Sequence, residues 1–462
     1  MKKSVYILLF LVPVVVSAQQ SWDKSSPLDY IWMNAGNAGF SEDLVQYPCL
    51  AFSPTDGKPY VAYQDGANYQ KATVMKFDGT NWVNVGNAGF SQGGAFFVSL
   101  AFSPSGEPFV AYMDFWNQMK ATVMKFDGNS WVNVGNVGFS AGPANFASLA
   151  LSTSGEPYVA YADNINSGKA TVMKFDGTNW GNVGSAGFSA GSIMYASLSF
   201  CPTDGKPYVA FHDQANAQKA TVMKFDGTSW VNVGVAGFSA GGAEYTSIAF
   251  NPSDNLPYIA FEDCGYACKS TVMKFDGTNW VNVGTVGFSA GQAEFTSLAF
   301  NSTGQPHVAY RDFGNNNKAT VMKFDGNNWM TVGNEGFSAG AEWGTNLAFS
   351  TTGEPYVVYV DSLNAYKATV MYYGLSTGIS ENKHPHLSFY PNPATTEITI
   401  DLKKISGRNI CVEVEDIRGI QIIRTETCEN KIKLNVANYP VGIYIVKINT
   451  ENSTWICKFC KE

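Results

Sequence analysis

Residues 99–135 read SLAFSPSGEPFVAYMDFWNQMKATVMKFDGNSWVNVG, and variants of this stretch recur through residues 30–373 with a period of 49 or 50 residues. Two markers identify the copies: a tryptophan and the first lysine of the KATVMKF segment. The tryptophans are Trp32, Trp82, Trp131, Trp180, Trp230, Trp280 and Trp329, and the lysines are Lys71, Lys120, Lys169, Lys219, Lys269, Lys318 and Lys367. A repeat of this length indicates a propeller, a solenoid or another array before any other architecture.

Each copy contains four short apolar segments separated by turn residues. The second segment opens on Pro108, which fixes φ and ends the preceding turn. Asp127-Gly128 separates the third segment from the fourth and is a strong hairpin signal. Four up-and-down strands in about 49 residues are typical of a propeller blade, and no segment has the 3.6-residue period of a helical solenoid. In the quoted copy the strands are expected at residues 99–103, 108–112, 120–126 and 131–135.

The phase of the repeat predicts how the ring closes. Trp32 lies in a lone fourth strand, expected at residues 31–36, whereas the last copy (residues 346–373) has no tryptophan strand after it. We therefore expect the N-terminal strand to complete the last blade, which removes two sheet edges that would invite aggregation. The predicted fold class is all-β: a seven-bladed β-propeller with four-stranded blades, followed by a small immunoglobulin-like β-sandwich.

The repeat region resembles repeat propellers in general and no specific enzyme family. Its Asp-Gly-x-x-Trp hairpin resembles the Asp-box of sialidases, but that motif separates the Asp from the Gly by one residue and here they are adjacent. The departure gives no reason to expect sialidase activity.

Both ends of the chain indicate export. Lys2 and Lys3, an apolar run at residues 5–16 and the small residues around Ser17 predict a signal peptide. No later stretch is apolar enough for a membrane helix, so no transmembrane segment is expected. The predicted organisation is a signal peptide at 1–18, the propeller at 19–373, a polar linker at 374–386 and a C-terminal domain at 387–462.

The C-terminal region alternates apolar and polar residues over about seven short segments, which favours a small antiparallel sandwich. It carries Tyr390-Pro391-Asn392-Pro393, then Asp-Ile-Arg-Gly at 416–419, then PVGIYIVK at 440–447, which includes Gly442 and Tyr444. These motifs resemble the type A C-terminal sorting domain of the type IX secretion system. The resemblance implies export across the outer membrane of a member of the Bacteroidota, with the secretion machinery and its sortase as partners. It also implies a secreted or cell-surface location.

The net charge limits the expected partners, and the cysteine content permits disulfides. The net charge is −8 without a basic patch, so nucleic acid is not an expected partner. Eight cysteines in an exported chain permit disulfides. Cys264 and Cys268 are close enough in sequence for a local bridge, and Cys411 and Cys428 flank a turn and could pair across a hairpin.

An aspartate ends the second strand of every copy, a lysine follows six residues later, and an asparagine lies between them in six copies. We interpret the pattern as an Asx-type turn with the asparagine in a left-handed conformation and an Asp–Lys pair across the hairpin. The alternatives are a structural calcium site and a seven-fold glycan site. No other cofactor is expected.

Positions that differ between copies are freer to serve a ligand, and they gather on the face formed by the loops before the first strand and after the second. The candidate residues divide into two arcs. Blades one to three offer Phe96, Phe115 and Trp116, with Tyr69, Met113 and Met119. Blades four to seven offer His212, Glu244, Glu262, Glu294, Arg311 and Glu342.

Aromatic rings that face carboxylates suit a glycan or protein ligand, because the rings stack and the carboxylates accept hydrogen bonds. The alternative is that these are ordinary rim and packing residues. A polysaccharide-degrading enzyme would need two carboxylates about 5–10 Å apart, for which Glu244 and Glu294 are the best pair. A structural surface or adhesin role is the third interpretation. No catalytic motif is recognised in the sequence, and close copying between blades favours the binding and structural roles.

Overall fold

The computed structural model describes residues 30–375, 388–402, 410–417, 419–450 and 454–462. One compact unit is Tyr30–Gly374, and the described C-terminal strands belong to a second unit. The predicted signal peptide (1–18) and nearly all of the predicted linker (374–386) lie outside the described residues. Within them, no helix is both long and apolar enough to cross a bilayer.

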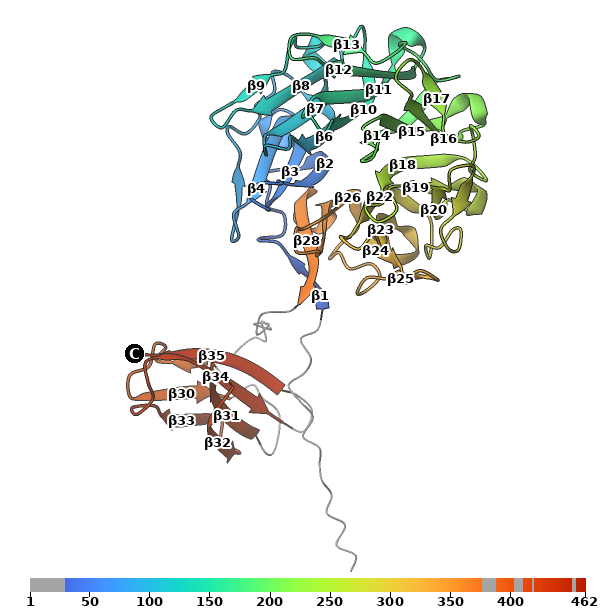
Figure 1. Ribbon diagram of the computed structural model, residues 1–462. Coiled ribbons are helices and arrows are strands. Elements are labelled where there is room, and N and C mark those ends of the chain that lie inside the picture. Colours follow the sequence, from blue (N-terminus) through green and yellow to red (C-terminus); the bar gives the residue numbers. More distant parts are fainter. Residues whose placement is uncertain (1–29, 376–387, 403–409, 418, 451–453) are drawn as a thin grey trace, which may run out of the picture. The chain divides into compact units, whose positions relative to one another are not determined.

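Seven four-stranded antiparallel sheets follow one another along the first unit and confirm the predicted seven-bladed propeller (Figure 1). Blades 1 and 2 contain β2 (Val45–Phe52), β3 (Pro59–Asp65), β4 (Lys71–Phe77), β5 (Trp82–Asn84), β6 (Ala95–Phe102), β7 (Pro108–Asp114), β8 (Lys120–Phe126) and β9 (Trp131–Asn133). Blades 3 and 4 contain β10 (Ala144–Leu151), β11 (Pro157–Asp163), β12 (Lys169–Phe175), β13 (Trp180–Asn182), β14 (Ile193–Phe200), β15 (Pro207–Asp213), β16 (Lys219–Phe225) and β17 (Trp230–Asn232).

The remaining blades repeat the pattern, and each second strand ends in a single turn of 3-10 helix. Blades 5 and 6 contain β18 (Ala243–Phe250), β19 (Pro257–Asp263), β20 (Lys269–Phe275), β21 (Trp280–Asn282), β22 (Ala293–Phe300), β23 (Pro306–Asp312), β24 (Lys318–Phe324) and β25 (Trp329–Thr331). Blade 7 contains β26 (Glu342–Phe349), β27 (Pro355–Asp361), β28 (Lys367–Leu375) and β1 (Tyr30–Asn34). The 3-10 turns are Gly66–Asn68, Phe115–Asn117, Asn164–Asn166, Gln214–Asn216, Cys264–Tyr266, Phe313–Asn315 and Ser362–Asn364.

The ring closes as the phase of the repeat predicts, because β1 pairs with β28 at the outer edge of blade 7 (Figure 1). The indole Nε1 of Trp32 donates to the Val332 carbonyl at 2.7 Å. The indole ring also stacks on Phe337, with ring centroids 3.9 Å apart. Every other marker tryptophan donates in the same way to a carbonyl of the preceding blade. The repeated tryptophan is therefore one of the contacts that join neighbouring blades.

A second belt of hydrogen bonds ties the innermost strands together around the channel. The Oγ of Ser99 accepts from the Leu149 backbone N–H of the next blade at 3.0 Å. Cys49 takes the place of serine in blade 1, and at the seam Asn346 Oδ1 accepts from the Leu50 N–H at 2.8 Å. The other serines of the belt are Ser148, Ser197, Ser247 and Ser297.

The repeated aspartate is buried and belongs to a turn, which corrects the predicted Asp–Lys pair. Asp213 accepts from the Ala215 N–H at 3.1 Å, from Asn216 Nδ2 at 2.8 Å and from Thr221 Oγ1 at 2.9 Å. No ion pair joins these aspartates to lysines in the described part of the chain, and at Asp213 the turn's own donors occupy the carboxylate. The left-handed residues are the two that follow the asparagine, such as Ala217 with φ 56° and Gln218 with φ 66°. This arrangement is that of a turn capped by the aspartate side chain.

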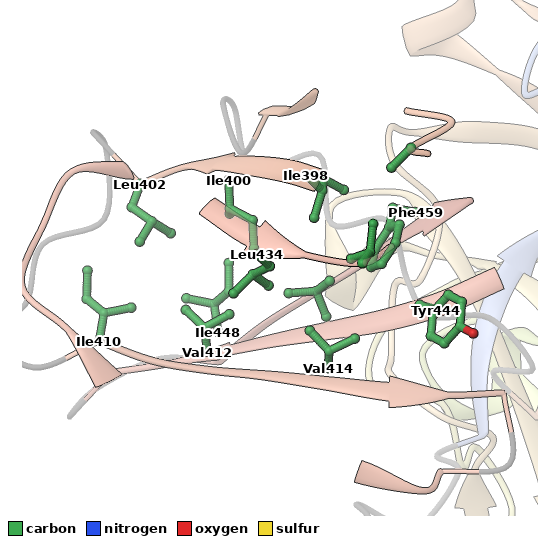
Figure 2. Close-up of a cluster of buried hydrophobic side chains, with 13 residues drawn as sticks. Ile398, Ile400, Leu402, Ile410, Val412, Val414, Leu434, Tyr444, Ile448 and Phe459 are labelled. Atoms are coloured by element: carbon green, nitrogen blue, oxygen red, sulfur yellow. The ribbon is translucent and has the colours of Figure 1, made fainter. Parts of the chain in front are cut away.

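The described residues of the second unit form seven short strands, where the sequence predicts about seven. A three-stranded sheet has the order β29 (Ser388–Tyr390), β30 (Glu397–Asp401), β33 (Lys431–Asn435), and a four-stranded sheet has the order β32 (Gln421–Thr427), β31 (Ile410–Asp416), β34 (Gly442–Asn449), β35 (Thr454–Lys461). Figure 2 shows Ile398 and Ile400 of one sheet pointing toward Val412, Val414 and Ile448 of the other. The two sheets thus bury one shared apolar core.

The sorting-motif residues hold this unit together. The Oδ1 of Asn392 accepts from the Cys460 N–H at 2.9 Å, next to two cis peptide bonds that precede Pro391 and Pro393. Tyr444 is buried and its hydroxyl donates to the Pro440 carbonyl at 2.7 Å. Gly442 starts β34 and Tyr390 ends β29.

The predicted disulfide between Cys411 and Cys428 is absent, and both are free cysteines. Cys411 lies opposite Glu426 across the β31–β32 pair, whereas Cys428 follows the end of β32 and is exposed. The register therefore does not set the two cysteines opposite each other.

Candidate functional site

Each innermost strand contains a β-bulge near its start, on the face that the sequence predicts for a ligand. In blade 1 the register shifts between Gln46 and Cys49, and the residue between them that has positive φ is Tyr47. Six blades place an aromatic residue in this left-handed conformation, with φ between 50° and 55°: Tyr47, Phe97, Phe146, Tyr195, Tyr245 and Phe295. A left-handed backbone at a bulky residue is uncommon and points to a constraint from packing or from function.

These six residues form an aromatic ring, and they line a cavity of about 850 Å³ at the mouth of the central channel. Neighbouring ring centroids are 5.1, 4.9, 5.4, 4.7 and 4.7 Å apart around the circle. Blade 7 has Gly344 at the equivalent position, so the aromatic ring is open between Phe295 and Tyr47. A Cβ atom at Gly344 would meet Pro48 Cδ at 3.0 Å, so even alanine would be tight there.

The predicted acidic residues lie just outside the aromatic ring, in pairs across neighbouring strands. Glu244 of β18 is opposite Glu262 of β19, and Glu294 of β22 is opposite Arg311 of β23. The Nη1 of Arg311 donates to Glu294 Oε2 at 2.9 Å. The guanidinium carbon lies 4.7 Å from the ring centroid of Trp343. Blade 6 thus neutralises its carboxylate internally, and blade 5 does not.

Glu262 is almost completely buried, with 1% of its surface exposed. Its Oε1 accepts from Gln292 Nε2 at 3.0 Å, and its Oε2 has no hydrogen-bond partner. Burial, with the nearby Glu244 carboxylate, raises the pKa of Glu262 to about 8. The Tyr195 hydroxyl donates to Glu244 Oε2 at 3.3 Å, which connects the acidic pair to the aromatic ring. Burial and Glu244 together raise the pKa of Tyr195 to about 12.

His212 and Glu342 are buried behind this surface. The Nδ1 of His212 is 3.0 Å from the Ala243 carbonyl, and its Nε2 is 3.1 Å from Gln214 Nε2, which assigns the proton to Nδ1. Burial lowers the pKa of His212, so the ring is neutral. Glu342 accepts from Thr345 Oγ1 at 2.5 Å, and burial raises the pKa of Glu342 to about 8.

The predicted aromatic arc is only partly assembled. The rings of Phe96 and Phe115 are 5.9 Å apart, and Phe96 is also 6.3 Å from Tyr47 of the aromatic ring. Trp116 points outward with 66% of its surface exposed, and Lys71 Nζ lies 5.8 Å from its ring centroid. The structure therefore brings Phe96 and Phe115 to the aromatic ring and leaves Trp116 outside.

The loop after β19 contains a disulfide between Cys264 and Cys268. Side-chain atoms of these two cysteines and of Glu262 lie within 4.8 Å of one another. Because the two sulfurs are bonded to each other, they are not thiolate ligands for a metal.

The aromatic ring itself was not predicted. Its residues directly follow the variable positions and are aromatic in six of the seven copies. That repetition was a usable signal, but an aromatic at a repeated position is equally expected in a core. Only the bulge turns these side chains toward the channel.

Comparison with known proteins identifies the C-terminal unit. Residues 388–462 match the family described as the secretion system C-terminal sorting domain. This match confirms the resemblance carried by the sequence motifs. The protein is therefore secreted to the cell surface or beyond it. No curated protein is similar in sequence to this chain.

Solved propeller structures are distantly similar. PorZ, an essential surface component of the type IX secretion system of Porphyromonas gingivalis, is 13% identical with a TM-score of 0.46; the match covers 91% of this chain and 60% of PorZ. An ulvan lyase is 11% identical with a TM-score of 0.47, covering 72% of this chain and 94% of the lyase. An α-L-arabinanase of Penicillium chrysogenum is 11% identical with a TM-score of 0.41, covering 75% and 98%.

Proposed function

We propose that the propeller is a secreted or cell-surface glycan-binding module and that the mouth of its central channel holds the ligand. The observation that carries this proposal is the aromatic ring, whose six side chains line one cavity. Each of these side chains is half-buried. Sugar rings have apolar C–H faces that pack against aromatic rings, and hydroxyl groups that need fixed polar partners.

The cavity also offers those polar partners. Gln46 and the tyrosines of the aromatic ring line the cavity with polar groups. Thr246 and Thr296 also line it, but their hydroxyls already donate to the Tyr195 and Tyr245 carbonyls. A volume of about 850 Å³ falls in the range of small-molecule and oligosaccharide sites. The site is therefore large enough to bury a sugar unit and polar enough to orient it.

A polysaccharide-degrading enzyme is the second candidate, because Glu262 has a raised pKa beside Glu244, an arrangement that resembles a general acid next to a carboxylate. Two observations favour binding instead. Glu262 is 1% exposed, so a substrate does not reach its carboxyl group in this structure. Glu294, the other predicted carboxylate, is engaged by Arg311.

The test is a glycan and polysaccharide binding screen with residues 19–374 expressed alone, with reducing-sugar release measured on every hit. Tyr245→Gly removes one member of the aromatic ring and copies the residue that blade 7 already has there. We expect this variant to lose binding and Trp116→Ala to keep it. Loss of binding in Trp116→Ala but not in Tyr245→Gly would instead place the site around Trp116.

Two other outcomes would contradict the proposal. Sugar release that disappears in Glu244→Gln would identify an enzyme. Absence of binding to any glycan would leave a protein ligand or a structural surface role, and the aromatic ring would then be a packing feature of the channel.

A further inference from the structure

We propose that the ligand carries positive charge, namely that it is an oligosaccharide of amino sugars with free ammonium groups. This inference rests on the proposed glycan-binding function and specifies its ligand class. It comes from comparing blade 5 with blade 6, which place different residues at the same two positions beside the channel mouth.

In blade 6 the two positions hold a carboxylate and a cation. Arg311 pairs with Glu294 at 2.9 Å. Its guanidinium carbon also lies 4.9 Å from the ring centroid of Phe313 and 4.7 Å from that of Trp343. This edge of the mouth therefore already stabilises one cation through a carboxylate and aromatic faces.

In blade 5 the same two positions hold two carboxyl groups. Glu244 and Glu262 are direct cross-strand partners, and burial beside the Glu244 carboxyl group keeps Glu262 protonated at neutral pH. Neither has an ion-pair partner among the residues that the structure describes, and Glu262 Oε2, which is buried, accepts no hydrogen bond. The lysine that begins β20, Lys269, pairs in register with Asp263 rather than with these acids. Blade 5 thus lacks the cation that blade 6 provides from its own chain.

The surroundings of the blade 5 pair suit an ammonium group. Tyr195, which donates to Glu244, and Tyr245, of the same strand as Glu244, are neighbouring members of the aromatic ring. The faces of aromatic rings attract cations within about 6 Å. The nearby His212 is neutral, so it adds no competing positive charge. An ammonium group on a sugar held by the aromatic ring would pair with Glu244 of blade 5 as Arg311 pairs with Glu294 in blade 6.

The experiment compares two ligands that differ at the amino group, which is a charged ammonium in one and a neutral acetamide in the other, using the chain from residue 19 to 462. Isothermal titration calorimetry is carried out with a glucosamine oligomer and with the N-acetylglucosamine oligomer of equal length. We expect the charged oligomer to bind at least about tenfold more tightly, since one cation–π and carboxylate contact is worth roughly a factor of ten.

Three variants assign the difference to blade 5. Glu244→Gln keeps the shape of the side chain, and we expect it to remove the preference for the charged oligomer. Glu262→Arg copies blade 6 and should weaken binding of the charged oligomer about tenfold while leaving the acetylated one unchanged. Glu107→Gln, at the other end of the strands where Glu107 pairs with Lys125, is the control and should keep the preference.

The outcomes separate this inference from the function on which it rests. Equal affinity for the two oligomers would overturn the inference and leave the glycan-binding proposal standing. Binding of neither oligomer, together with no hit in the wider screen, would overturn both. Tighter binding of oligolysine than of the glucosamine oligomer would replace the sugar by a cationic peptide.

Discussion

At the scale of single residues, seven tryptophans hold neighbouring blades together by the same pair of contacts. In Trp131 the indole stacks on Phe90 with centroids 4.1 Å apart, and its Nε1 donates to the Val85 carbonyl at 2.7 Å. The ring is therefore stabilised by one polar and one apolar contact at each junction. Because the donor is buried, loss of the indole removes a large apolar surface and leaves a carbonyl without its partner.

We expect Trp131→Ala to lower the free energy of unfolding by about 3–5 kcal/mol, the usual cost of deleting a buried aromatic side chain. Urea unfolding of residues 19–374, followed by circular dichroism, measures the change. Trp116→Ala is the matched control, and the change should stay within about 0.5 kcal/mol because the side chain is exposed. Similar losses in the two variants would show that the junctions do not depend on the indole.

Glu342 predicts a pH dependence of stability. Burial raises its pKa to about 8 in the folded protein, with Glu294 raising it further and Arg311 opposing the change. A glutamate in the unfolded chain titrates near 4.5, so the unfolded state loses its proton first as the pH rises. Stability is therefore highest below about pH 4.5 with respect to this group and falls as the pH rises toward 8.

We expect Glu342→Gln to lose less stability than the natural chain between pH 5 and pH 8, by on the order of a few kcal/mol. Thermal or urea unfolding at four pH values gives the two curves. Glu107→Gln, at a partly exposed position where Glu107 pairs with Lys125, is the control and should run parallel to the natural chain. If Glu342→Gln also ran parallel, the carboxyl group would be ionised in the folded state.

At the scale of the element, the blade owes its regularity to turn residues that the sequence displays. Pro108 and Asp127-Gly128 mark the limits of strands that the structure places at β7, β8 and β9. The innermost strand was predicted too short: β6 starts at Ala95 rather than at Ser99. The bulge between Phe96 and Ser99 explains the difference, because one extra residue breaks the two-residue alternation by which a strand is recognised.

The bulge and the packing between blades also limit how much of the candidate site could be predicted from the sequence. Its location on the face of the loops before the first strand and after the second came from positions that vary between copies, and Glu244, Glu262 and Arg311 are in that region. Their burial could not be predicted, because it depends on the neighbouring blade. His212, for example, bonds the Ala243 carbonyl, which belongs to the next blade. The aromatic ring forms only because of the bulge, and no pattern in the sequence predicted the bulge.

The buried aspartates offer a comparison between otherwise equal blades. Asp213 caps its 3-10 turn through the Ala215 N–H, whereas Asp114 has no backbone cap and its Oδ1 has no partner. We expect Asp213→Ala to cost about 1 kcal/mol more than Asp114→Ala, which is the usual value of a helix cap. The difference between the two urea midpoints measures it. Equal costs would mean that the cap contributes nothing to blade stability.

At the scale of the whole molecule, the propeller depends on a strand from the far end of its sequence. Trp32 of β1 and its acceptor Val332 are 300 residues apart. We expect removal of residues 19–34 to lower the melting temperature by more than about 10 °C, because blade 7 loses both a paired strand and the half-buried indole of Trp32.

Differential scanning calorimetry of residues 35–374 and 19–374 measures this effect. Removal of residues 376–462 is the control. Since the propeller and the sorting domain are separate compact units, we expect the propeller transition to stay within about 2 °C of its original temperature. If the chain without β1 melted like the intact propeller, the strand would not be what closes the ring.

The way in which β1 closes the ring also affects how separate copies of the protein could associate. Only hydrogen bonds and packing join β1 to β28 of blade 7. The β1 strand of a second copy could therefore pair with β28 in the same way. Exchange of β1 between two copies would give a domain-swapped dimer, and the segment after β1, in which Ala35, Phe40 and Val45 donate backbone N–H groups to blade 7, would have to move with it. Tethering gives the strand a local concentration of about millimolar, and exchange becomes competitive only when copies approach that density. At high dilution we therefore expect β1 to stay in its own ring, and crowding on a cell surface is the condition under which we expect strands to be shared.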